Sequence, residues 1–68
     1  MLSENEVLNA YHRTIARHRE RTGVSYPLTR ANCVDLDSQE IADTNVYEPQ
    51  VVATFACDAV GRLRIKLV

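Results

Sequence analysis

The chain has 68 residues, of which 46% are hydrophobic and 25% charged, and its formal net charge is −1. Its length limits it to a single small domain, residues 1–68, whose core is marginal in size. No apolar run approaches the ~18 residues that a membrane span needs, and no leading apolar run marks a signal peptide. We therefore expect a cytoplasmic protein with reduced thiols and no membrane partner.

An amphipathic helix is predicted over residues 4–21. Ser3 and Glu6 form an S-x-x-E capping box at its start, a pattern that satisfies free backbone N–H groups. Gly23 stands where a helix C-cap favours a left-handed residue. Apolar side chains at three- and four-residue spacing predict one buried face, which His18 extends. They are Val7, Leu8, Tyr11 and Ile15.

The middle segment, residues 24–47, carries weaker signals. A short strand is expected over residues 32–36, with Cys33 and either Val34 or Leu36 directed inward. The sequence DSQE at residues 37–40 has the pattern of a second capping box. It predicts a single helical turn that continues through residues 41–42.

The last part of the chain, residues 51–68, predicts a β-hairpin. The DAVG sequence at residues 58–61 suits a type I turn followed by a glycine bulge, with Asp58 paired with Arg62. This register gives a buried face of apolar pairs, namely Cys57 with Leu63, Phe55 with Ile65 and Ala53 with Leu67. It gives an outer face that pairs Ala56 with Arg64, Thr54 with Lys66 and Val52 with Val68. Pro49 is expected at a strand start or on an edge.

Together these elements predict an α+β fold. An N-terminal amphipathic helix packs on a small antiparallel sheet of three or four strands that ends in the C-terminal hairpin. The outer face of such a sheet stays in contact with water.

Basic side chains gather in two rows that are candidates for partner binding. Arg13, Arg17 and Arg21 recur every four residues on the helix, and Arg62, Arg64 and Lys66 follow one another on the last strand. Acidic residues dominate the middle of the chain. The segregation has two interpretations: the basic and acidic segments face each other internally, or they form surface patches that steer a partner.

Two tyrosines near prolines, Tyr26 and Tyr47, complete the candidate contact residues. Tyrosine is enriched at protein interfaces. The alternative is that both side chains cover the end of the sheet.

Patterns for metal binding and catalysis are not found. The acids that begin at Asp35 do not match a calcium loop, because Glu40 stands where that loop needs glycine. There is no C-x-x-C pair, and His12 and His18 fall on different helical faces, so no zinc site is predicted. The sequence has no glycine-rich phosphate loop and no G-x-S-x-G motif. We predict no cofactor, no metal and no enzymatic activity.

The predicted function is that of a small non-enzymatic interaction module that binds a protein partner or itself as a homodimer. The alternative is a nucleic-acid-binding protein that uses both basic rows, since phosphate neutralisation needs such rows. A small enzyme subunit with a Cys–His pair is a third and weaker hypothesis.

Overall fold

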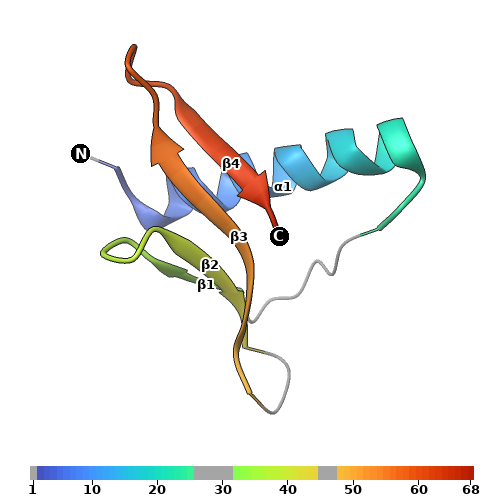
Figure 1. The fold of residues 1–68 in the computed structure, drawn as a ribbon, viewed down its shortest axis with the longest axis horizontal. Coiled ribbons are helices and arrows are strands. Elements are labelled where there is room, and N and C mark those ends of the chain that lie inside the picture. The colour runs from blue at the N-terminus through green and yellow to red at the C-terminus, as the bar shows by residue number, and fades with distance from the viewer. Residues whose placement is uncertain (1, 26–31, 45–47) are drawn as a thin grey trace.

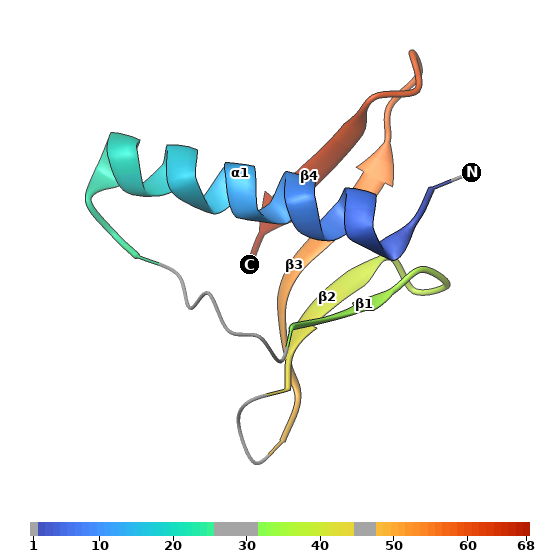
Figure 2. The same ribbon diagram turned by 180° about the vertical axis from the view of Figure 1, so that it is seen from behind.

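The computed structural model describes residues 2–25, 32–44 and 48–68. It confirms the predicted α+β fold: one helix covers one face of a four-stranded antiparallel sheet with the strand order β1-β2-β3-β4 (Figure 1, Figure 2). The elements in chain order are α1 (Glu4–Thr22), β1 (Asn32–Asp35), β2 (Glu40–Asp43), β3 (Gln50–Cys57) and β4 (Leu63–Leu67).

Helix α1 begins and ends at the predicted caps. The hydroxyl of Ser3 accepts a hydrogen bond from the backbone N–H of Glu6 at 3.2 Å. Gly23 adopts a left-handed conformation with φ of 75°, and its N–H donates to the carbonyl of Arg19 at 2.8 Å. Glu4 and Glu6 stand in the first turn, and arginines stand in the last. This arrangement of charge complements the helix dipole.

The hairpin of β3 and β4 has the predicted register. Phe55 pairs with Ile65 and Ala53 with Leu67. At the turn, the N–H of Gly61 donates to the carbonyl of Asp58 at 2.9 Å, and Gly61 has a φ of 80°. A type I turn with a glycine bulge, as predicted, therefore closes the hairpin.

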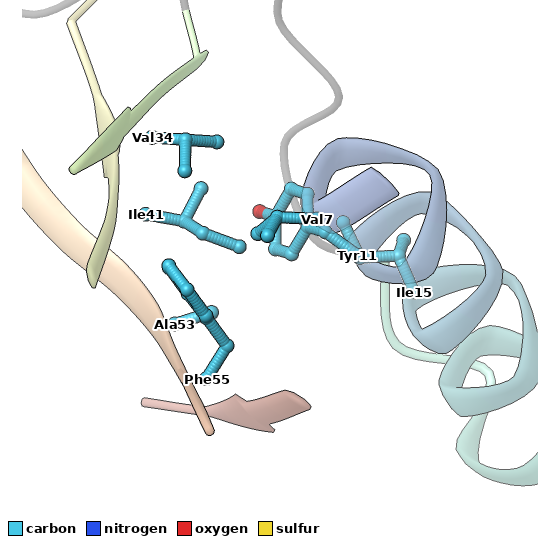
Figure 3. Close-up of a cluster of buried hydrophobic side chains, with 7 residues drawn as sticks. All are labelled: Val7, Tyr11, Ile15, Val34, Ile41, Ala53 and Phe55. Atoms are coloured by element: carbon cyan, nitrogen blue, oxygen red, sulfur yellow. The ribbon is translucent and has the colours of Figure 1, made fainter. Parts of the chain in front are cut away.

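The core lies between α1 and the inner face of the sheet. Val34, Ile41 and Ala53 are neighbours across β1, β2 and β3, and Phe55 lies further along β3. Figure 3 shows these side chains pointing toward the helix. The helix contributes Val7, Tyr11 and Ile15. Partly buried side chains from the N-terminal segment, α1, β3 and β4 pack around this cluster, namely Leu2, Leu8, Val52, Leu63, Ile65 and Leu67.

The predicted helical turn after Asp37 is wrong. Residues 36–39 instead form the turn between β1 and β2. The carboxylate of Asp35 accepts hydrogen bonds from the N–H groups of Asp37 at 3.0 Å and Ser38 at 3.1 Å. Gln39 then adopts a left-handed φ of 59°. Asp35 thus satisfies the local N–H groups within a tight turn, and β2 follows where the helix was expected.

Both cysteines were expected to face the core, and both are exposed. Cys33 pairs with Ala42, and strand alternation places Val34, not Cys33, on the inner face. Leu36 lies in the turn and is 40% exposed. Cys57 has the predicted register but stands at the end of β3 beside the turn. The tip of this hairpin projects beyond the helix (Figure 1), so no core covers Cys57.

Candidate binding groove

A groove runs between α1 and β4. It consists of adjoining hollows with cavity volumes of about 260 Å³ and 610 Å³. Residues 10–17 of α1 border the start of β4 in the smaller hollow, and residues 14–21 border its end in the larger one. Successive turns of α1 thus border successive residues of β4, although α1 crosses the sheet obliquely (Figure 1, Figure 2), and we call this surface the α1–β4 groove.

The walls of the α1–β4 groove are basic. Arg13, Arg17 and Arg21 line it from the helix, and we call these side chains the arginine stripe. Arg64 and Lys66 line it from β4. None of the described residues that border either hollow is acidic. The groove is thus a region of positive potential on a chain whose net charge is −1.

The position of the arginine stripe follows from the helical repeat. Residues four apart lie on one side of a helix, and the stripe lies next to the face buried by Tyr11 and Ile15. All members of the stripe are exposed. The basic row on the helix therefore lies on the side of α1 next to β4, and Arg64 and Lys66, which belong to the outer face of the sheet, border the groove at the edge of β4.

Thr14 and His18 also line the groove, and the sequence reasoning did not assign either residue to the site. The Thr14 hydroxyl donates to the carbonyl of Ala10 at 2.8 Å and accepts from Nη2 of Arg17 at 3.4 Å. This long contact links the guanidinium of Arg17 to another residue of the groove lining. The spacing of Thr14 and Arg17, three residues apart on a helix, is the signal that predicts such a pair.

Arg64 has a structural contact as well as its place in the groove. Its Nε lies 3.0 Å from Oδ2 of Asp58, and its side chain is still 67% exposed. The backbone N–H of Arg62 lowers the pKa of Asp58 below its ordinary value of 3.8, and the guanidinium of Arg64 adds to the effect. Lys66 has no such contact among the described residues, and its side chain is exposed.

The remaining candidate residues fall outside the groove. Arg62 is exposed beside the turn of the hairpin and lines neither hollow. Tyr26 and Tyr47 lie outside the described residues. The structure thus brings together the helical row and the two later members of the strand row.

Within residues 2–25, 32–44 and 48–68, no group of three histidine, cysteine or carboxylate side chains is placed to hold a metal ion. In that part of the chain, no helix has the length and apolar character that crossing a membrane requires.

No protein-family model, curated protein or solved structure matches this chain.

Proposed function

We propose that this chain is a non-enzymatic interaction module that binds an acidic segment of a protein partner through the α1–β4 groove. The observation that supports the proposal is the convergence of the arginine stripe with Lys66 and Arg64 on one groove. Such a cluster attracts carboxylates and raises the rate at which an acidic partner is encountered.

An acidic protein fits the surroundings of the groove better than a nucleic acid does. Single-stranded nucleic acids are held by exposed aromatic side chains on which bases stack. In the described part of the chain, the tyrosine and phenylalanine side chains are those of Tyr11 and Phe55, and both are buried.

The exposed thiols are relevant to the redox environment in which the proposed module acts. Cys33 and Cys57 are free and exposed. Exposed thiols persist in a reducing environment, whereas an oxidising one favours disulfides. This observation supports the cytoplasmic location that we propose for the protein.

A matched pair of double variants tests the proposed function. Arg17→Gln with Arg21→Gln removes two charges from the groove. Arg19→Gln with Arg62→Gln removes the same charge from exposed positions that do not line it. Each pair also removes one basic residue from the last turn of the helix, so the effects on the helix dipole are matched. The probes are a fluorescent oligoglutamate and a single-stranded oligonucleotide of equal charge.

The groove variant is expected to bind oligoglutamate about 3- to 10-fold more weakly than the unmodified chain, because exposed ion pairs contribute roughly 0.2–1 kcal/mol each. The control variant is expected to change binding little. An equal loss in both variants would contradict a specific groove. Tighter binding of the oligonucleotide, with a steep loss between about 50 and 200 mM salt, would favour the nucleic-acid alternative.

A further inference from the structure

Among the described residues β4 pairs with β3 alone, and its other edge, which we call the open edge, forms part of the same groove. β4 is the last strand of the sheet. The register of the hairpin determines which of its backbone groups form hydrogen bonds with β3. The N–H of Val68 donates to the carbonyl of Val52 at 3.1 Å, and the N–H of Asp58 donates to the carbonyl of Arg62 at 2.8 Å. Residues of an antiparallel strand alternate in the side to which they direct N–H and C=O. Arg64 and Lys66 therefore bond to β3, whereas Leu63, Ile65 and Leu67 direct their backbone groups to the open edge.

Helix α1 overhangs this edge. Figure 1 and Figure 2 show the C-terminal half of α1 projecting past β4 on the side away from β3. The side of the helix that faces this space carries Arg17 and Arg21. A strand added next to β4 would thus lie beneath the arginine stripe, with its backbone against the open edge.

An added strand would cross the arginine stripe obliquely, because α1 crosses the sheet at an angle and contacts both edge strands, β1 and β4 (Figure 1, Figure 2). Alternate side chains of a strand point to the same face. Those that the added strand directs toward α1 would therefore meet the members of the stripe beside the end of β4, Arg17 and Arg21.

We infer that the acidic partner binds as an antiparallel fifth strand on β4, with the carboxylates of its helix-facing side chains directed toward Arg17 and Arg21. The inference rests on the proposed function and names its mode of recognition, the addition of a peptide strand to a sheet edge. An antiparallel arrangement continues the pairing of every neighbouring strand in the sheet.

A second copy of the chain fits this edge poorly. Two-fold pairing of β4 with itself about Ile65 would place Arg64 opposite Lys66 of the other copy. Like charges directly opposite each other destabilise a strand pair. The arginine stripes of the two helices would also approach each other. The same charges that attract an acidic segment therefore oppose a homodimer through β4.

Residue-resolved amide hydrogen exchange on the full chain tests the inference. The probe is a capped peptide of alternating glutamate and threonine. In an antiparallel fifth strand with glutamates facing α1, the glutamate N–H groups bond to β4 and the threonine N–H groups point away. A peptide N-methylated at glutamate loses these bonds, and one N-methylated at threonine keeps them as the matched control.

On saturation with the unmodified peptide, exchange at Leu63, Ile65 and Leu67 is expected to slow by about tenfold or more, because these amides gain a partner. Exchange at Arg64 and Lys66, whose amides already bond to β3, is expected to change little. The threonine-methylated peptide should reproduce this pattern, and the glutamate-methylated peptide should not.

Other outcomes would overturn the inference. If the peptide binds in an arginine-dependent manner without slowing the odd-numbered amides, strand addition is wrong and the proposed function stands. If neither this peptide nor oligoglutamate binds, the proposed function is wrong as well. If an oligouridylate slows these amides instead, the occupant is a nucleic acid. If the amides of Leu63, Ile65 and Leu67 are protected without peptide, and light scattering gives a mass above 7.7 kDa, a second copy of the chain occupies the edge of β4.

Discussion

Replacement of Phe55 by alanine tests the packing of the sheet on the helix. Phe55 is 3% exposed and faces the helix from β3 (Figure 3). A buried phenylalanine changed to alanine costs about 3–5 kcal/mol, since both transfer energy and a cavity contribute. A chain of 68 residues has a total stability of about 3–10 kcal/mol. Phe55→Ala is therefore expected to remove at least about a third of the stability and in the extreme all of it.

Cys57→Ala is the matched control, because Cys57 lies two residues further along the same face of β3 but is exposed. Its cost is expected to stay within about 0.5 kcal/mol. Lys66→Ala, on the outer face, should also stay within about 0.5 kcal/mol. Urea unfolding followed by circular dichroism measures all three variants. An osmolyte that strengthens apolar burial restores a folded baseline if Phe55→Ala unfolds in buffer. Equal losses in Phe55→Ala and Cys57→Ala would refute the assignment of the core.

Other predictions concern the helix cap and the hairpin turn. Ser3→Ala removes the hydroxyl that accepts from Glu6 at 3.2 Å and is expected to cost about 1 kcal/mol; Ser3→Asp should restore that stability in urea unfolding, and an unchanged Ser3→Ala would contradict the cap. The folded pKa of Asp58 lies below its ordinary value of 3.8, so its charge stabilises the fold at neutral pH, and this contribution disappears as pH falls through the folded pKa. The stability lost by Asp58→Asn is therefore expected to be larger at pH 7 than at about pH 2, and a pH-independent loss would show that the carboxylate's charge is not involved.

The helix and the hairpin were predictable because local residues determine them. Ser3 and Gly23 fix the ends of α1 by hydrogen bonds to residues no more than four positions away. The turn at Asp58 likewise fixes the register of β3 and β4 through contacts within a few residues. Such local signals can be recognised in the sequence without knowledge of contacts between distant residues.

The segment that joins these elements was mispredicted because two local patterns compete. Asp35 and Asp37 both offer a carboxylate to the N–H groups that follow. A helix cap at Asp37 is the stronger pattern in isolation. In the fold, Ile41 is fully buried opposite Val34 and Ala53. Packing of Ile41 in the centre of the core therefore selects the strand and leaves Asp35 to form the turn, an outcome that depends on distant residues.

The candidate site was predictable as a set of residues but not as a surface. The arginine stripe and the cations of the last strand are visible in the sequence. Whether these two rows face each other depends on which side of α1 lies over β4. The orientation is decided by the positions of Val7, Tyr11 and Ile15 relative to a sheet whose strand order the sequence does not state. For the same reason, Arg62 was grouped with Arg64 and Lys66, although it lies beside the turn and outside the groove.

The two basic rows, on β4 and on α1, need different physical explanations. Lysine and arginine on an edge strand are a common protection against unwanted strand pairing, so Arg64 and Lys66 alone would be accounted for by the solubility of the sheet. The solubility of the sheet does not account for the arginine stripe, because the stripe lies on a helix and protects no strand of its own. Its placement over the open edge adds positive charge where edge protection is already provided. In the proposed binding mode, these charges oppose a second copy of the chain and favour a strand of opposite charge, and this difference is the physical argument for the acidic partner that we propose.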